Sequence, residues 1–287
     1  MLSELRELWK FRELLVSMVQ RELRVRYKGS VLGFLWSFIN PLVTTAVMWV
    51  VFGKLLHNRI DNYAAYILAA LLPFTFFQTS VLDASQSVLN SLPIIKKTYF
   101  PQAILPIASV ISNFIHLLMG LGVFFVFLLV IYLRDPRVLP FQVSTVYLPI
   151  LLLLSLLMAT GLSLLVSALN TLYEDVKYLV NVAMYMLFYL CPIIYFYEQV
   201  SNSDLNRSTN FLAFKLYCLN PMAILVTAYR KSLLAPPTKI YMSDGRVSDS
   251  IPLPWWALPY VTLFSILLFL LGWTVFHRLK WKFVERP

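Results

Sequence analysis

The chain has 287 residues, of which 59% are hydrophobic and only 13% are charged, and its formal net charge is +10. This composition leaves too little polar surface for a water-soluble globule, so it predicts a polytopic membrane protein. The basic residues flank apolar stretches instead of lining one solvated face, which favours membrane lipid over nucleic acid as the partner of the positive charge.

The first 28 residues form the first predicted element. Its apolar side chains recur near helical spacing, and most of its charged side chains lie off that stripe. The stripe consists of Leu5, Leu8, Trp9, Leu15, Val16, Val19 and Leu23. This pattern predicts an amphipathic helix over residues 1–28 that lies in the membrane interface, either as a plain anchor or as a docking site for a partner.

Six uncharged stretches follow, each long enough to cross a hydrocarbon layer of about 30 Å. They cover residues 31–52, 63–82, 102–133, 146–172, 178–197 and 256–276. We therefore predict an all-α fold with six transmembrane helices. The whole chain, residues 1–287, forms one domain in which residues 31–197 make the first five spans and 277–287 a tail.

Lysine and arginine are distributed unequally along the chain. Seven of the 24 precede residue 31 and four follow residue 276, whereas the short loops after the first and third spans hold two each. Because basic short segments stay on the cytoplasmic side, both termini are predicted to be cytoplasmic. The cluster just before the first span, Arg21, Arg24, Arg26 and Lys28, either only sets this topology or also meets an anionic substrate head.

The connection of residues 198–255 is predicted to be an outer loop. Within it, the uncharged stretch from Leu216 to Tyr229 has only about two-thirds of spanning length and contains Asn220-Pro221. This predicts a re-entrant segment that lines a path, because non-helical backbone at membrane depth needs protein or water as partner. A helix resting on the outer leaflet would also fit. In the fifth span, Pro192 predicts a kink.

Signals for catalysis are weak. The chain lacks a phosphate-binding loop, so we expect it to bind no nucleotide cofactor and to hydrolyse no nucleotide by itself. His57, His116 and His277 are far apart and lack carboxylates at ligand spacing, which disfavours a metal site. His116 is expected to pack against another helix, with a role in transport as the alternative.

Acidic residues in the spans are few. Asp83 is the best candidate for a membrane-buried acid, and no second acid in the spans pairs with it, which disfavours proton coupling. A membrane glycosyltransferase or phosphotransferase would need an acid cluster for a metal and a sugar nucleotide. The nearest candidate is Asp244 with Asp249 on the outer loop, so an enzyme is disfavoured.

Aromatic residues are abundant, with 21 Phe, 16 Tyr and 7 Trp. Such rings suit the membrane interface. A file of them along the kinked fifth span, at Tyr185, Tyr189 and Tyr195, would also suit sugar rings, whose apolar faces can lie on aromatic faces while their hydroxyls stay wet.

Four stretches in order carry a family resemblance: RELRVRYKGSVLGFLWSFINPL, NSLPIIKKTYFPQAILP, YEDVKYLVNVAMYMLFYLCPIIY and LNPMAILVTAYRKSL. Together they resemble the permease subunits of ABC transporters that export O-antigen, capsule or wall teichoic acid. The resemblance implies a multi-pass protein of the bacterial cytoplasmic (inner) membrane. It also implies a homodimer, two copies of a separate ATP-binding subunit that carries ATP and Mg, and a lipid-linked polysaccharide as cargo. A drug or small-lipid efflux permease is the alternative, and a membrane transferase is a weaker one.

The resemblance also implies roles for particular residues. Contacts with the ATPase are expected from the coupling helix of residues 92–101 and the turn after the fourth span: Leu92, Ile94, Ile95, Lys96, Lys97, Tyr99, Phe100, Glu174 and Asp175. The anionic head group would meet Arg21, Arg24, Arg26, Tyr27 and Lys28. The channel aromatics would be Phe34, Trp36, Tyr185, Phe188, Tyr189 and Tyr195. The outer gate would contain Asn220, Pro221, Tyr229 and Arg230.

Overall fold

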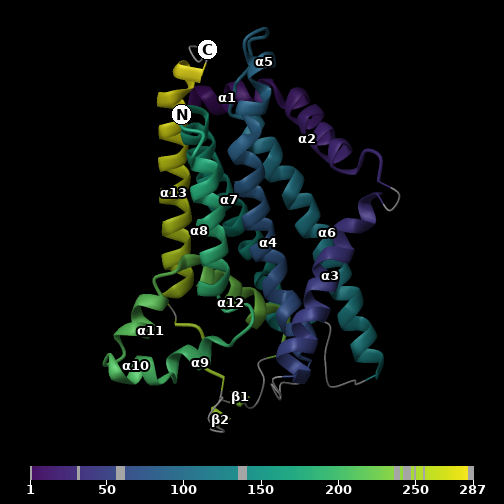
Figure 1. Cartoon of the computed structure of the whole chain (residues 1–287), viewed down its shortest axis with the longest axis vertical. Helices are drawn as coiled ribbons and strands as arrows, with labels where there is room; N and C mark the ends of the chain where they lie inside the picture. The colour runs from purple at the N-terminus through teal and green to yellow at the C-terminus, as the bar shows by residue number, and fades with distance from the viewer. Residues whose placement is uncertain are drawn as a thin grey trace.

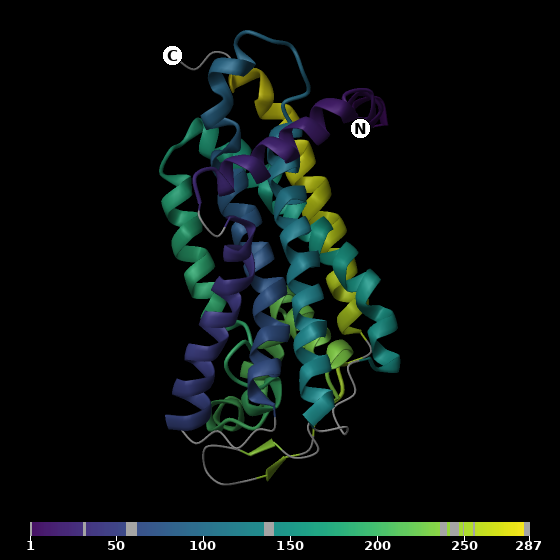
Figure 2. The same cartoon turned by 90° about the vertical axis from the view of Figure 1, so that its right-hand side faces the viewer.

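Long apolar helices lie side by side and form the body of the protein (Figures 1 and 2). The computed structural model describes residues 2–30, 33–55, 62–134, 141–235, 240–241, 247–248, 250–254 and 256–283. Four of the described helices are long and apolar enough to cross a membrane: α4 (Tyr63–Ser87), α6 (Ile104–Arg134), α7 (Leu148–Leu172) and α13 (Ala257–Leu279). The prediction of an all-α, multi-pass architecture is confirmed.

Two further apolar helices are shorter. They are α3 (Trp36–Met48), which continues as a π-helical turn (Trp49–Leu55), and α8 (Val176–Leu190). The total of six crossings therefore stays a prediction. The fifth predicted span is too long at its end, because the helix stops at Leu190 instead of bending and continuing to Tyr197. Cys191 is extended, since the following Pro192 disfavours the helical conformation there.

The chain termini lie at one end of the bundle, together with the short helix α5 (Leu92–Ile95) (Figure 1). We call this the terminus end. The predicted N-terminal helix is two helices, α1 (Leu2–Lys10) and α2 (Arg12–Tyr27), which meet at Phe11. Its apolar stripe is only partly covered: Val19 is buried, whereas Trp9 is 70% exposed. Whether these helices lie in the interface stays a prediction. Single turns of 3-10 helix cover Gly33–Leu35, Leu89–Ser91, Val143–Tyr147 and Lys280–Phe283.

The opposite end, which we call the loop end, is built from short elements. They are α9 (Tyr197–Ser201), α10 (Asp204–Ser208), α11 (Leu212–Tyr217), and the antiparallel strands β1 (Ile240–Tyr241) and β2 (Val247–Ser248). Helix α12 (Pro221–Leu233) points back into the bundle and is buried along most of its length. Asp244 and Asp249 lie outside the described residues.

The predicted segment from Leu216 to Tyr229 is divided between α11 and α12. The division falls at Asn220, whose side-chain oxygen accepts hydrogen bonds from the backbone N–H groups of Met222 and Ala223. Asparagine at the N-cap followed by proline in the first turn is a strong start signal for a helix. At about 1.5 Å per residue, the 13 residues of α12 span about 20 Å. This helix cannot cross a bilayer alone, and its re-entrant character stays a prediction.

Two glycines, Gly161 on α7 and Gly272 on α13, bring these helices into close contact. A Cβ atom added to Gly272 would lie 2.0 Å from the backbone oxygen of Gly161, and one added to Gly161 would lie 2.6 Å from the backbone nitrogen of Phe269. Small residues that let two backbones approach are the usual device for helix association in a membrane. These two helices are held together by direct contact between their backbones.

Candidate functional site

A charged cluster joins the end of α2 to the bundle. One guanidinium nitrogen of Arg26 donates to Asn113 Oδ1 at 2.8 Å, and the other donates to Asp83 Oδ2 at 2.5 Å. The amide of Asn113, on α6, also donates to Asp83, on α4, at 2.9 Å. Asn113 is 2% exposed, whereas the side chains of Arg26 and Asp83 are 34% and 41% exposed. Arg26 is therefore a partly exposed cation that is held by the side chains of Asn113 and Asp83.

A second polar group lies beside the first. The Tyr27 hydroxyl hydrogen-bonds to the Ser37 hydroxyl and lies 3.2 Å from Nδ1 of His116. The two rings meet edge to face, with centroids 5.7 Å apart. His116 therefore packs against another element, as the sequence predicted, and it also takes part in a polar contact that links α2, α3 and α6.

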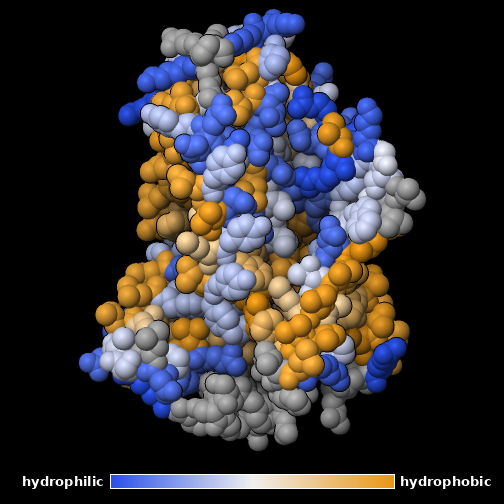
Figure 3. Space-filling model, in the orientation of Figure 1, coloured by the Kyte–Doolittle hydropathy of each residue, from blue (hydrophilic) through white to orange (hydrophobic). Residues whose placement is uncertain are grey.

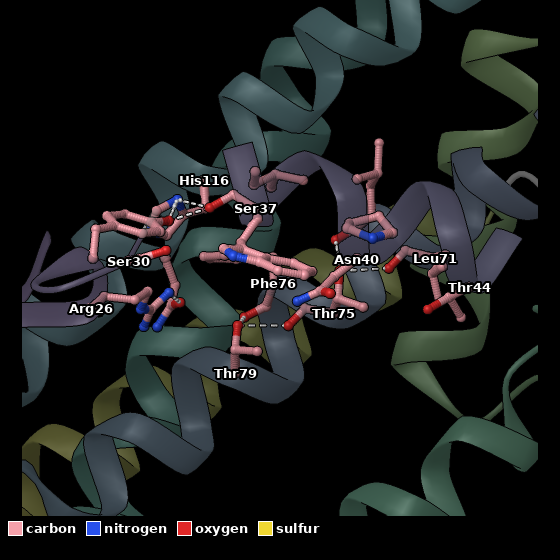
Figure 4. A pocket seen from close by; sticks show the side chains of 16 residues that line it. Arg26, Ser30, Ser37, Asn40, Thr44, Leu71, Thr75, Phe76, Thr79 and His116 are labelled. Carbon is pink, nitrogen blue, oxygen red and sulfur yellow. Dashed lines mark hydrogen bonds between the residues drawn. The ribbon is translucent and has the colours of Figure 1, made fainter. Parts of the chain in front are cut away.

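Arg26 and Asn113 of the first group and Tyr27, Ser37 and His116 of the second line one pocket of about 410 Å³ between α2, α3, α4 and α6. Its size falls within the range of about 300–1,000 Å³ typical of small-ligand sites. Figure 4 shows Arg26 and His116 at one end of the pocket and Thr44 and Leu71 at the other. Several of its lining side chains carry oxygen: Ser30, Ser37, Asn40, Thr44, Thr75 and Thr79. The pocket combines a cation with a polar wall between apolar helices.

The helical geometry of α2 divides the predicted head-group residues. Successive residues of a helix turn by about 100°, so Arg21 and Arg24 lie on nearly the opposite face from Arg26. Arg21 and Arg24 are exposed, and Arg21 pairs with its neighbour Glu22 at 3.3 Å. Lys28 is exposed just after the helix. Only Arg26 and Tyr27 of the predicted set line the pocket.

The predicted channel aromatics do not form one file. Tyr185 and Tyr189 are 60% and 70% exposed on one face of α8, whereas Phe188 is half-buried and packs edge to face against Phe74. Tyr195 lies beyond the end of α8, where its hydroxyl donates to the Tyr189 carbonyl at 3.0 Å. Figure 3 shows pale residues running down the face over α8.

The two remaining members of this set lie near α3. Trp36 lines the pocket between α2, α3, α4 and α6, and it is 45% exposed. The Phe34 side chain lies outside the described part of the structure.

The predicted ATPase-contacting residues divide into buried and exposed sets. Ile95 and Phe100 are buried in this chain's own core beside Trp273 and Phe276, so their side chains do not face outward. Leu92 is half-buried at the edge of that core. The exposed set consists of Ile94, Lys96, Lys97, Tyr99, Glu174 and Asp175.

Tyr99 connects the exposed turn after α5 to α1. Its hydroxyl donates to Glu7 Oε1 at 3.0 Å, and this hydrogen bond to a carboxylate raises the pKa of Tyr99 above the ordinary phenol value. The terminus end therefore presents α1 and the α5 turn as a joined surface.

Of the predicted gate residues, Tyr229 and Arg230 are buried in the bundle, whereas Asn220 and Pro221 are half-buried. Asn220 and Pro221 start α12, and the Tyr229 hydroxyl lies 2.9 Å from the Ser155 hydroxyl on α7. Arg230 is 2% exposed and donates to the backbone carbonyls of Tyr66, Tyr195 and Ile193. Its guanidinium carbon lies 4.0 Å from the centre of the Tyr66 ring. Arg230 thus supplies hydrogen-bond partners to the non-helical backbone that follows α8.

Asn113, Thr75 and Thr79 were not predicted as site residues. Each is a polar residue inside an apolar helix, which is a signal for function that sequence alone carries. Asp83 was noted, but the sequence could not show that its partner is a cation from outside the spans.

The long apolar helices and the polar pocket between them are the architecture of a multi-pass membrane protein. Comparison with known proteins agrees: residues 13–234 match the family described as ABC-2 type transporter, and the chain belongs to that family. The protein is therefore a non-catalytic transmembrane subunit of a transporter.

Individual relatives cover most of the chain. The O-antigen export system permease protein RfbA of Klebsiella pneumoniae is 28% identical over 274 residues, which is 95% of this chain and 94% of that protein. The protein of the same name from Myxococcus xanthus is 30% identical over 230 residues, 80% of this chain and 84% of its own length. The polysialic acid transport protein KpsM of Escherichia coli is 18% identical and covers 90% of both chains.

Proposed function

We propose that this chain is the channel-forming permease subunit of an ATP-driven exporter that moves a lipid-linked polysaccharide across the bacterial cytoplasmic membrane. The observation that carries this proposal is the similarity to O-antigen export permeases along nearly the whole chain. The similarity to a polysialic acid transport protein supports polysaccharide as the shared class of cargo. A drug or small-lipid efflux permease has no comparable support.

The working assembly in this proposal is a homodimer with two copies of an ATP-binding subunit. Helix α8 supports it with two adjacent exposed stripes. Tyr185 and Tyr189 lie on one, and Leu179 and Met186 lie about 100° away on the other. The apolar stripe would pack on the second copy while the tyrosines face the path. In this arrangement α3 and α8 complete the six crossings, and the terminus end is cytoplasmic.

The ATP-binding subunits would dock at the terminus end. The exposed residues there are the surface available to them: Ile94, Lys96, Lys97, Tyr99, Glu174 and Asp175. At the loop end, the half-buried start of α12 at Asn220 and Pro221 would act as the outer gate, while Arg230 anchors the other end of this helix. The diphosphate of the lipid carrier would meet Arg26 first, because arginine offers phosphate a fork of N–H donors.

The proposal is tested with the complex of this chain and its ATP-binding partner in proteoliposomes. ATP hydrolysis should rise several-fold with a lipid-linked glycan and stay at its basal rate with cationic drugs. Stimulation by drugs alone would favour the efflux alternative. Hydrolysis of ATP by this chain without a partner would contradict its role as a permease subunit.

The head-group role has its own test. Replacing Arg24 and Arg26 together by glutamine should reduce export at least tenfold while the complex still assembles, since the phosphate loses Arg26, the cation of the pocket, and the outward-facing positive charge of Arg24. The matched control is Arg207→Gln, which removes one exposed charge from α10 at the loop end. Normal export by the double variant would refute the head-group role.

A further inference from the structure

The pocket between α2, α3, α4 and α6 extends well beyond Arg26. Thr75 lies eight residues before Asp83, the partner of Arg26 on α4, which corresponds to about 12 Å along the helix axis. Over this distance the wall includes Thr79 and Thr75 from α4 and faces Asn40 from α3 (Figure 4). A phosphate anchor alone does not need polar side chains so far from its cation.

The threonines of α4 present acceptors to this space. Thr75 Oγ1 donates to the carbonyls of Leu71 and Leu72 at 2.8 and 2.9 Å, and Thr79 Oγ1 donates to the Thr75 carbonyl at 2.7 Å. A hydroxyl has one hydrogen and two lone pairs, so these groups keep acceptor capacity after bonding to their own helix. The wall therefore suits a ligand that is rich in hydroxyl donors.

An aromatic ring completes the lining. Trp36 lines the same pocket and is 45% exposed, so an aromatic ring borders the polar wall. A sugar ring has this combination, with hydroxyls around its edge and apolar C–H groups on its faces. Asn40, with one amide oxygen and two N–H groups, can both accept from and donate to hydroxyls.

At the end of the pocket that would bind an anion, Arg26 is already paired with Asp83. Arg26 has five N–H donors, and its contacts with Asn113 and Asp83 account for two bonds. A phosphate can therefore approach the same guanidinium, and the Asp83 carboxylate beside it opposes this approach through its like charge. Asp83 would tune how tightly an anion is held.

We propose that this pocket is a sugar-phosphate site, in which Arg26 holds the carrier phosphate and Asn40, Thr75, Thr79 and Trp36 hold the first sugar attached to it. The proposal rests on the proposed function and deepens it. The subunit would then distinguish a loaded lipid carrier from an empty one by direct contact with the sugar.

The experiment measures binding of two probes to the complex in nanodiscs: a polyprenyl diphosphate that carries one hexose, and the same lipid without sugar. The unchanged protein should bind the hexose-bearing probe about tenfold more tightly. The double variant Thr75→Val with Thr79→Val keeps the side-chain shape but removes the acceptors. It should lose most of that preference and bind the bare lipid as before.

Three further variants separate the causes. Thr274→Val on α13 is the matched control, because its hydroxyl also donates to its own helix, at 2.6 Å, and it does not line the pocket. It should keep the full preference. Arg26→Gln should weaken the binding of both probes. Asp83→Asn should strengthen the binding of both.

Two outcomes would count against different claims. Equal binding of the two probes by the unchanged protein, or a preference that survives the threonine double variant, would overturn the sugar site and leave the export function in place. Failure of the unchanged complex to bind either probe would contradict the proposed function itself.

Discussion

The two flanks of the bundle hold their arginines in opposite ways. On the α3 flank, Arg26 is about one-third exposed and bonds to the side chains of Asp83 and Asn113 beside an open pocket. On the α12 flank, Arg230 is buried and bonds to backbone carbonyls. Side-chain partners beside a pocket can be exchanged for a ligand, whereas backbone carbonyls remain where the fold puts them. The first flank is built to bind and the second to hold.

The largest effect on stability is expected from Arg230→Met. The carbonyls of Tyr195 and Ile193 lie in non-helical backbone, and each buried group left without a partner costs about 1–3 kcal/mol. We expect a loss of about 3 kcal/mol or more, measured as a lower unfolding midpoint of the purified complex. Arg230→Lys keeps the charge but has fewer N–H donors. Its unfolding midpoint should lie between those of the unchanged protein and Arg230→Met. An unchanged unfolding midpoint for Arg230→Met would show that Arg230 does not stabilise the fold, and the two flanks would then not differ in this way.

The packing of α7 on α13 gives the second prediction. Gly272→Ala places a methyl group against the backbone of Gly161, which neither helix can avoid without moving. Overpacking of this kind costs about 1–3 kcal/mol and should lower the unfolding midpoint. Gly122→Ala is the matched control, because nothing lies within 4 Å of the added atom. The control should be neutral or slightly stabilising, and equal losses for both variants would show that close packing is not the cause.

The α12 flank with Arg230 was harder to predict from the sequence than the α3 flank with Arg26. The uncharged stretches showed where the long helices lie, and the RELRVRYK segment showed that a cation stands beside the first of them. The sequence could not show that Arg26 faces the pocket while Arg24 faces away from it. Which way each side chain points depends on how α2, which starts at Arg12, packs on the bundle. Nor could the sequence show that Arg230 bonds to the backbone after α8. That contact joins residues 35 or more positions apart, and it depends on α8 ending at Leu190.

A smaller effect on stability is expected from Asp83→Asn on the α3 flank. In the ion pair with Arg26 the two side chains are 34% and 41% exposed, and pairs of that kind contribute about 0–1 kcal/mol. The unfolding midpoint should therefore change little, although phosphate binding changes. A loss as large as that of Arg230→Met would mean that the pocket flank is as fixed as the other.

The smallest effect on stability is expected from Tyr99→Phe, which removes the hydrogen bond to Glu7 between two exposed side chains. The global midpoint should stay within about 0.5 kcal/mol of the unchanged protein. Hydrogen exchange in α1 should nevertheless become faster, because this bond joins α1 to the turn after α5.

The pH dependence of this contact separates the bond from general loosening. Because the pKa of Tyr99 is raised, the phenol keeps its proton, and the bond to Glu7 persists beyond the pH at which an ordinary tyrosine ionises. Protection of α1 should be lost as the pH rises through that raised value, and the Tyr99→Phe variant should lack this step. In a double-mutant cycle with Glu7→Ala, the second substitution should add no further loss. Additive losses would mean that α1 is held to the terminus end by other contacts, and that the joined surface does not depend on this bond.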